Sequence, residues 1–393
     1  MVASITIGVS PRERFAIAAE SLESLLAHTG EPFELLYVDA AIPAQYRGQI
    51  LGMLRDREAT ELIAVDRPLL PGQSKNLIVD RASGDYVCLV ENDVLFTDGW
   101  LDQLLAACEE FPADVAAPII NEGRATKEHF DQLLGRISNS STVPGKLEIS
   151  PLGERRNEAT IRHRVDLVEQ HCLLFRADVF ERIGRFDEEL NTRDEIDLSL
   201  ALWSKGQTVV LEPEAVVHYV PPSAPPEPDE LDFYMMRWDL DRAIRSRERI
   251  REKWNLVETP GNLGFVRYRN LIPRLHEVRA ELARLATRPN TIALVDDGDW
   301  FGTEVTEGLD LVPFPNRGGE YWGFPSSDDD AADELLRIVA AGTTHVVVGW
   351  PAFWWFDYLP GWGQRLVEVS RSVTTNELMR IYTLDSTSAP MTA

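Results

Sequence analysis

Gly84-Asp-Tyr-Val-Cys-Leu-Val-Glu-Asn-Asp93 leads an unbroken apolar run directly into acidic residues. The run from Tyr86 to Val90 has the composition of a strand that is buried on both faces. Ligands bind at the carboxyl ends of the strands in open α/β sheets, so Glu91 and Asp93 are expected at a ligand-binding edge. Two carboxylates at such an edge are suited to holding a divalent cation against a diphosphate group.

Strand-like and helix-like patterns alternate through the first 120 residues. Apolar, strand-like runs occur at residues 5–9, 33–38 and 62–65. The order Ser10-Pro-Arg-Glu13 matches an N-cap, a first-turn proline and a capping-box glutamate, which predicts a helix from there to about His28. Because parallel strands need crossover helices, this βαβαβ order predicts a doubly wound α/β sheet. Asp39 and Asp93 are expected on the same rim of that sheet.

The pattern changes after residue 120. Residues 121–165 have no clear period, and the polar stretch 138–145 predicts either a loop that covers a site or a surface insertion. Asn191-Thr-Arg-Asp-Glu-Ile-Asp197 then predicts the start of a helix that Lys205-Gly206 ends. Strands are expected after it at residues 208–211 and 215–219. The proline-rich stretch 221–228 marks a domain boundary.

Charge and composition exclude some classes of protein. The 393 residues carry a formal net charge of −25, and a nucleic-acid binder needs a basic face, so no nucleic-acid partner is expected. The three cysteines lie in apolar contexts, which is typical of buried thiols in a reducing compartment, and a cytoplasmic location is therefore expected. No apolar run approaches the roughly 18 to 20 residues of a membrane span, so any membrane contact is expected to be peripheral.

Short motifs follow one another along residues 1–225. They are Asp39 after the second strand, Gly72-Gln-Ser-Lys-Asn76 with Ala82-Ser-Gly-Asp85, Glu91-Asn-Asp93, Phe186-Asp-Glu188 with Asp194-Glu-Ile-Asp197, and Pro213-Glu-Ala-Val-Val-His218. In this order they resemble a family-2-type glycosyltransferase of the GT-A fold. The resemblance implies a metal-dependent enzyme that transfers a sugar from a nucleotide diphosphate sugar to an acceptor hydroxyl, with inversion at the anomeric carbon.

The resemblance also implies roles for residues that would bind the donor. Asp39 stands where the family has an acid that reads the nucleotide base, and a role in the turn after its strand is an equal alternative. Lys75 and Asn76 belong to the segment that leads to the metal motif. They could contact phosphate or cap the chain, and the structural role is favoured.

Glu91-Asn-Asp93 stands where the family has Asp-x-Asp, so the resemblance makes Asp93 the expected metal ligand. Glu91 is longer than the usual aspartate and could touch the ribose or a metal-bound water instead of the ion. His218 matches a histidine that lies near the metal in many members, and a structural role for a histidine at a strand end is an equal alternative. An imidazole ligand favours Mn²⁺ over Mg²⁺, so Mn²⁺ is the expected cofactor, with Mg²⁺ as the alternative.

Transfer also needs a carboxylate that takes the proton of the acceptor hydroxyl. The resemblance makes Glu195 the candidate base. The family usually presents Glu-Asp where this chain reads Asp194-Glu195, so the role could also fall to Asp194 or Asp197. Thr192-Arg-Asp-Glu195 is at the same time a capping-box pattern, in which Glu195 would only bond the backbone amide of Thr192.

Beyond the proline-rich boundary, residues 226–290 are expected to form a helical linker. The helical pattern 231–254 carries a crowd of basic residues in its second half. Ion pairs with an acidic face of the protein are the favoured role for them, and contact with an anionic acceptor at a membrane surface is the alternative.

Residues 291–393 repeat strand and helix signals and are expected to form a small second α/β domain. Its first strand, Thr291-Ile-Ala-Leu-Val295, runs into Asp296-Asp297-Gly298, where turn acids are favoured over a second site. The aromatic stretch Trp350–Tyr358 could stack on sugar rings, but aromatic residues more often fill a core.

Two further function classes stay open. A sugar nucleotidyltransferase would use the same sheet and acids, but it needs a glycine-rich basic loop after the first strand, which Gly8-Val-Ser-Pro-Arg12 matches poorly. A non-catalytic carbohydrate-binding or scaffold protein would account for the irregular acidic motifs and the aromatic tail. The expected partners are a nucleotide diphosphate sugar donor and a glycan or lipid-linked acceptor.

Overall fold

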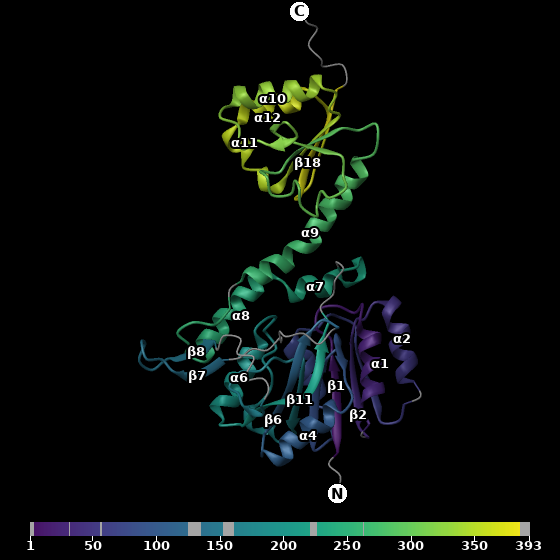
Figure 1. Cartoon of the computed structure of the whole chain (residues 1–393), viewed down its shortest axis with the longest axis vertical. Coiled ribbons are helices and arrows are strands. Elements are labelled where there is room, and N and C mark those ends of the chain that lie inside the picture. The colour runs from purple at the N-terminus through teal and green to yellow at the C-terminus, as the bar shows by residue number, and fades with distance from the viewer. Residues whose placement is uncertain are drawn as a thin grey trace, which may run out of the picture. The chain divides into compact units, whose positions relative to one another are not determined.

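The computed structural model describes residues 4–30, 32–55, 57–124, 135–151, 161–220, 226–261 and 263–385. The chain forms two compact units, residues 1–270 and 271–393 (Figure 1). The expected helical linker, residues 226–290, is divided between these units. The three-part division with boundaries at 225 and 290 stays a prediction.

A mixed sheet of nine strands forms the centre of the first unit. Its strand order is β3-β2-β1-β4-β10-β6-β11-β5, and β9 pairs with β11. The strands are β1 (Ile5–Ser10), β2 (Glu34–Ala40), β3 (Thr60–Val65), β4 (Tyr86–Glu91), β5 (Val94–Phe96), β6 (Val115–Glu122), β9 (His163–Arg164), β10 (Cys172–Arg176) and β11 (Val209–Tyr219). The pairs among β1 to β4 are parallel, whereas β10 runs antiparallel between β4 and β6. The predicted α/β class is confirmed.

Helices connect the parallel strands as the alternating pattern predicts. The helices of the first unit are α1 (Ala18–His28), α2 (Ala44–Leu54), α3 (Pro71–Val79), α4 (Trp100–Glu110), α5 (Val179–Ile183), α6 (Asp194–Ser204), the 3₁₀ turn η1 (Pro228–Glu230), α7 (Leu231–Arg237) and α8 (Leu240–Lys253). α1, α2 and α3 are the crossovers between the parallel strands. The helix expected to end at Lys205-Gly206 is α6, and Gly206 follows it with a left-handed φ of 65°.

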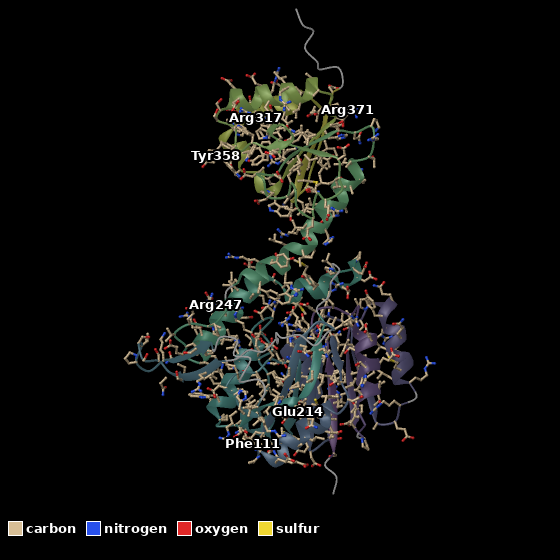
Figure 2. The ribbon with its side chains drawn as sticks, viewed as in Figure 1. Phe111, Glu214, Arg247, Arg317, Tyr358 and Arg371 are labelled. Carbon is tan, nitrogen blue, oxygen red and sulfur yellow. The ribbon has the colours of Figure 1, made fainter. Side chains whose placement is uncertain are left out.

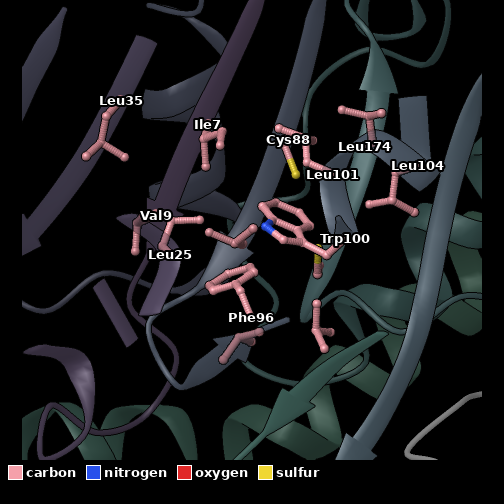
Figure 3. Close-up of a cluster of buried hydrophobic side chains, with 14 of the residues drawn as sticks. Ile7, Val9, Leu25, Leu35, Cys88, Phe96, Trp100, Leu101, Leu104 and Leu174 are labelled. Atoms are coloured by element: carbon pink, nitrogen blue, oxygen red, sulfur yellow. The ribbon is translucent and has the colours of Figure 1, made fainter. Parts of the chain in front are cut away.

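Strand β4 is covered on both faces, which explains its unbroken apolar sequence. Cys88 and Val90 belong to one core cluster, and Val87 and Leu89 belong to another. Side chains alternate across a strand, so a strand between two layers needs apolar residues at every position. Figure 3 shows the first cluster, in which Trp100 lies among the side chains that β1, β4 and α4 supply. The three cysteines are buried and free, as expected.

The first helix begins later than the capping pattern predicts. Ser10 is the last residue of β1, and α1 begins at Ala18. The side chain of Asn92 accepts a hydrogen bond from the Arg12 amide at 3.1 Å and donates one to the Arg14 carbonyl at 2.8 Å. These bonds hold the chain after β1 in a loop beside the end of β4. A partner distant in sequence therefore overrides the local helix-start signal.

Part of the aperiodic stretch forms a hairpin. β7 (Gly135–Asn139) and β8 (Leu147–Pro151) pair antiparallel, and the polar residues 140–146 connect them. The polar stretch that predicted a loop is therefore the end of a strand and a turn. Of the other stretches expected to lack regular structure, residues 125–134, 152–160 and 221–225 lie outside the described residues.

The basic helix α8 is tied to the first unit by ion pairs. Arg249 Nε lies 2.8 Å from Asp187 Oδ2, and Lys253 Nζ lies 2.8 Å from Asp197 Oδ2. Arg247, labelled in Figure 2, lies on the same helix. These pairs favour the ion-pairing interpretation of the basic residues. In the described part of the chain, no helix combines the length and the apolar character that crossing a membrane requires.

The second unit contains a five-stranded sheet with the order β13-β12-β16-β18-β17. Its elements are β12 (Ile292–Val295), β13 (Leu311–Pro313), β14 (Asn316–Arg317), β15 (Glu320–Tyr321), α10 (Asp328–Ala340), β16 (His345–Gly349), η2 (Trp350–Ala352), α11 (Trp355–Tyr358), α12 (Pro360–Glu368), β17 (Ser370–Thr375) and β18 (Met379–Leu384), and α9 (Gly264–Leu285) leads into it. Trp355 and Trp362 fill its core. Tyr358 is 71% exposed and projects from the surface (Figure 2), so the aromatic stretch is shared between core and surface.

Candidate functional site

The carboxyl ends of β1 and β4 lie side by side. The two strands are parallel, and Ser10 is paired with Glu91 where they end. The chain then turns at Asn92 and enters β5, so Glu91 and Asp93 flank the turn. Arg12 reaches the same place from the loop after β1. Its Nε lies 3.1 Å from Glu91 Oε2, and its Nη1 lies 3.7 Å from Asp93 Oδ2.

Glu91, Asp93 and His171 form a cluster that can hold a metal ion. One ligand atom from each of these buried residues lies within 4.8 Å of the other two. His171 Nδ1 is 2.8 Å from Glu91 Oε2. Burial opposes ionisation of Glu91, but Arg12 and His171 together hold the pKa of this carboxyl well below its ordinary value. Two carboxylates and an imidazole are a donor set that suits Mn²⁺.

Asp93 is the member of the cluster whose environment is least satisfied. Its side chain is fully buried, and neither carboxylate oxygen accepts a hydrogen bond from the described residues. Burial raises the pKa of Asp93 to about 7, an effect that Arg12 opposes and Glu91 strengthens. A buried carboxylate without donors is unfavourable, and a cation held between Asp93 and its neighbours would compensate for it. The residues present therefore fit a divalent cation.

The structure brings His171, and not His218, to the two carboxylates. His218 Nδ1 lies 3.0 Å from the carbonyl oxygen of Gly123, and His218 is not a member of the cluster. His171 precedes β10, which runs antiparallel to β4, and its carbonyl accepts a hydrogen bond from the Glu91 amide at 2.9 Å. His171 thus takes the place that the sequence-based expectation assigned to His218. A histidine just before an apolar strand was the only local signal, because the pairing of distant strands is decided by tertiary structure.

Lys75 lies fully buried between two acidic groups. Its Nζ is 2.9 Å from Asp194 Oδ2 and 3.7 Å from Glu91 Oε1, and it also donates a hydrogen bond to Gln170. The structure therefore brings Lys75 to the site, as a link between the metal cluster and helix α6. A buried ammonium is stabilised by such partners. Its positive charge in turn favours the ionised form of both carboxylates.

Asn76 and Asp39 have partners within the fold. The side chain of Asn76 bonds both the carbonyl and the amide of Phe186, at 3.0 Å and 2.9 Å. Asp39 accepts hydrogen bonds from the Ile42 amide at 3.0 Å and from Arg47 Nε at 2.6 Å. These bonds match the structural alternatives for both residues. Neither residue is among those that line the pocket described below.

Helix α6 presents Asp194 and Glu195 in its first turn. Arg193 precedes the helix with a φ of 63°, in the left-handed region that few residues other than glycine adopt. No side chain caps this helix, so the capping-box pattern does not describe its start. Burial opposes ionisation of Asp194, but Lys75 and Arg237 lower the pKa of its carboxyl below the ordinary value.

The other two candidate bases differ sharply. Asp197 is bound on both carboxylate oxygens, by Trp254 Nε1 at 2.6 Å and by Lys253 Nζ at 2.8 Å. Glu195 is only partly buried, and the hydrogen bond to its carboxylate comes from its own backbone amide. Burial, with Asp194 close by, raises the pKa of Glu195 to about 7. A carboxyl that titrates near neutrality can accept a proton efficiently.

A pocket of about 430 Å³ is lined by Glu91 and His171 of the metal cluster and by Asp194 and Glu195 of α6. Its lining comprises Arg12, Glu91, Glu122, Glu169, Gln170, His171, Thr192, Arg193, Asp194, Glu195, Ile196, Tyr219, Arg237, Trp238, Pro260, Gly261, Phe265, Val266 and Arg269. One side comes from the strand ends and the start of α6. The other side comes from α7 and the first turns of α9, so segments after the proline-rich stretch complete a pocket that begins at the sheet.

Residues 11–184 match the model of a family described as Glycosyl transferase family 2. The likeness to this family is therefore confined to residues 11–184. The matched residues contain all three members of the metal cluster, whereas α6 and every later element lie beyond them.

Two related proteins are about one-quarter identical to this chain over the aligned residues. A Drosophila melanogaster polypeptide N-acetylgalactosaminyltransferase 12, whose name marks it as inactive, is 24% identical over 188 residues, which are 46% of this chain and 32% of that protein. The O-antigen biosynthesis protein RfbC of Myxococcus xanthus is 24% identical over 211 residues, 52% of this chain and 16% of that protein. The chain thus spans about a third or less of the length of these relatives. A crystal structure of GalNAc-T7 with UDP, GalNAc and Mn²⁺ is 13% identical, with a TM-score of 0.44 over 71% of this chain and 58% of that one.

Proposed function

We propose that the first unit is an enzyme that transfers a sugar from a nucleotide diphosphate sugar to an acceptor hydroxyl, with a divalent cation held by Glu91, Asp93 and His171. The observation that carries this proposal is the fully buried Asp93 carboxylate, which has no hydrogen-bond donor among the described residues and lies beside two further ligand groups. A bound cation would neutralise the charge that develops on the β-phosphate as the glycosidic bond breaks. The imidazole of His171 favours Mn²⁺ over Mg²⁺.

Glu195 is the base in this proposal. It lines the pocket, its carboxylate has no described side-chain partner, and its pKa of about 7 leaves much of it ionised at neutral pH. Asp194 lines the pocket too, but Lys75 and Arg237 hold its charge in place. Glu195 therefore takes the proton of the acceptor hydroxyl as that oxygen attacks the anomeric carbon from the face opposite the diphosphate, which inverts the configuration.

The acceptor in this proposal is a glycan or a lipid-linked sugar. The name of the relative from Myxococcus xanthus, an O-antigen biosynthesis protein, supports this class. Arg12 assists at the donor side, because its guanidinium lines the pocket next to Glu91 and its Nη1 has no hydrogen-bond partner among the described residues. A charged donor in that position can bond a phosphate oxygen.

Calorimetric titration of UDP, GDP and TDP and of the corresponding triphosphates, with and without Mn²⁺, tests the proposal. Diphosphate binding that requires Mn²⁺ and is lost in Asp93→Asn supports sugar transfer. Preference for the triphosphates over the diphosphates would indicate a nucleotidyltransferase instead, and absence of nucleotide binding would indicate a carbohydrate-binding scaffold. Asp296→Asn in the second unit is the matched control, because it removes a buried strand-end carboxylate away from the pocket.

A further inference from the structure

One wall of the pocket carries buried N–H groups that lack acceptors. Arg237 is 6% exposed, and its Nε and Nη1 make no hydrogen bond to the described residues. The same holds for the indole Nε1 of Trp238, which is 3% exposed, and for Nε of Arg269. All three residues line the pocket. A buried donor without an acceptor costs free energy, so this wall fits a ligand that brings acceptor oxygens.

Aromatic rings hold the two guanidinium groups in place. The Arg237 guanidinium lies 5.3 Å from the Trp238 ring, and the Arg269 guanidinium lies 5.6 Å from that ring and 4.9 Å from the Phe265 ring. Each guanidinium also lies near one carboxylate, at a distance close to the upper limit for a hydrogen bond. Arg237 Nη1 is 3.6 Å from Asp194, and Arg269 Nη1 is 3.5 Å from Glu13. Nε and Nη1 of Arg237 and Nε of Arg269 therefore stay available to a ligand.

The strand ends and the helical wall favour ligand groups of opposite charge. At the strand ends the unsatisfied atoms include the carboxylate oxygens of Asp93, which favour a cation, together with Nη1 of Arg12. On the helical wall they are N–H groups of Arg237, Trp238 and Arg269, which call for an anion. The contact of Arg237 with Asp194, the neighbour of Glu195, places this end of the wall beside the base.

Given the glycosyl transfer proposed above, we propose that Arg237, Trp238 and Arg269 bind an acidic group of the acceptor, a carboxylate or a phosphate, so that the enzyme selects an anionic acceptor. The wall is built by α7 and the start of α9, well beyond the residues that match the family model, which end at 184. The selection for charge is therefore a property of this chain's own helical segment.

Titration of the full chain with matched sugars tests this proposal. The probes are glucose, glucuronate and glucose 6-phosphate, each added in the presence of Mn²⁺ and UDP. We expect at least one of the two charged sugars to bind about tenfold to a hundredfold more tightly than glucose, since a hydrogen bond to a charged group contributes that much. The two charged probes distinguish a carboxylate from a phosphate. Equal binding of all three sugars, or no binding of any, overturns the proposal.

Two variants identify the residues responsible. Arg269→Gln removes one cation, and Trp238→Phe removes the indole N–H while keeping an aromatic ring. Both are expected to reduce the preference for the charged sugar about tenfold. Arg317→Gln is the control, because Arg317 also lies over an aromatic ring, at 4.7 Å from Trp322, but in the second unit. Its preference should equal that of the original protein.

A different outcome would assign the wall to the donor. If Arg269→Gln weakens UDP binding and leaves the sugar preference intact, the wall binds the diphosphate and the acceptor proposal is wrong. Mn²⁺-dependent UDP binding, measured in the same samples, separates this result from failure of the glycosyltransferase proposal itself. Unfolding temperatures of the variants show whether each protein is folded. If Arg269→Gln does not fold, Trp238→Phe still tests the proposal.

Discussion

Both units contain a buried parallel strand that ends in acids, and the two ends are used differently. In the second unit β12 ends at Asp296, whose carboxylate accepts hydrogen bonds from the Trp300 amide at 2.7 Å and the Phe301 amide at 2.6 Å. In the first unit β4 ends at Glu91, and Asp93 after it accepts no hydrogen bond from the described residues. Burial raises the pKa of both aspartates.

The contrast shows what separates a turn acid from a ligand. Asp297 follows the same rule as its neighbour, since its carboxylate accepts bonds from the Tyr321 hydroxyl at 3.1 Å and from Trp354 Nε1 at 3.3 Å. The acids of the second unit shape their turn, and their oxygens are engaged by the protein. Asp93 is buried as deeply, but its oxygens accept no hydrogen bond from the described residues. Its carboxylate is therefore suited to the cation of the proposed metal site.

The same contrast on helix α6 gives the largest expected effect. The carboxylate of Glu195 has no side-chain partner among the described residues, and that of Asp197 has two. We expect Glu195→Gln to lower the rate of sugar transfer about 10²- to 10⁴-fold, because the amide cannot accept the proton of the acceptor. Asp197→Asn should retain most of the activity. Initial rates of nucleoside diphosphate release measure both, and equal losses in the two variants would contradict the assignment of the base.

The pH dependence of transfer tests the same carboxyl. Since the pKa of Glu195 is raised to about 7, the ionised base is present above that pH and is lost below it. The transfer rate of the original protein should therefore rise as pH increases from 5, reach half its maximum near pH 7, and differ about a hundredfold between pH 5 and its plateau. A rate that is already constant from pH 5 to 6 would show that another group is the base.

Substitution of the strand-end acids tests the comparison directly. We expect Asp93→Asn to weaken Mn²⁺ binding by more than about a hundredfold, since even the loss of an outer partner of a ligand costs about 10- to 100-fold. Asp296→Asn should leave Mn²⁺ binding unchanged. Calorimetry with Mn²⁺ alone measures both variants without any knowledge of the donor. Equal affinities in the two proteins would remove the distinction between the two strand ends.

Substitution of the two histidines tests which of them binds the metal. We expect His171→Gln to weaken Mn²⁺ binding about tenfold to a hundredfold. His218→Gln should have little effect, because the described contact of that ring is the carbonyl of Gly123. The same titration compares the two. A larger loss in His218→Gln would return the metal role to the residue that the family resemblance indicated.

The smallest expected effect is on the free energy of unfolding, where Asp296→Asn should cost more than Asp93→Asn. Asp296→Asn should lower the free energy of unfolding of the second unit by about 2 kcal/mol, because several backbone amides lose a charged acceptor. Asp93→Asn, without metal, should destabilise the first unit less, because Asp93 accepts no hydrogen bond from the described residues and Arg12 Nη1 lies 3.7 Å away. Urea unfolding followed by tryptophan fluorescence reports mainly the second unit, where six of the ten tryptophans lie from Trp300 onward. An equal loss of stability in Asp93→Asn would contradict the distinction between Asp93 and Asp296.

Much of the fold could be read from local patterns. The alternation of strands and helices and the burial of β4 on both faces follow from apolar residues spaced at intervals that neighbouring residues alone create. The start of α1 was predicted wrongly, because Asn92 bonds the chain after β1. His171 was missed for a related reason, since only the antiparallel pairing of β10 with β4 brings it to Glu91.

The sequence by itself determined that the first unit is an α/β sheet with acids at the end of β4, because strand periodicity and the order of residues along one strand are local properties. Only the tertiary structure decided which of those acids keep partners, which histidine joins them, and which helices close the pocket. Hydrogen-bond partners such as Trp300 for Asp296, and pocket residues such as Arg237 beside Asp194, come from other elements of the fold. Whether a buried polar atom is satisfied is therefore a property of the folded chain, and it is this property that distinguishes the candidate site.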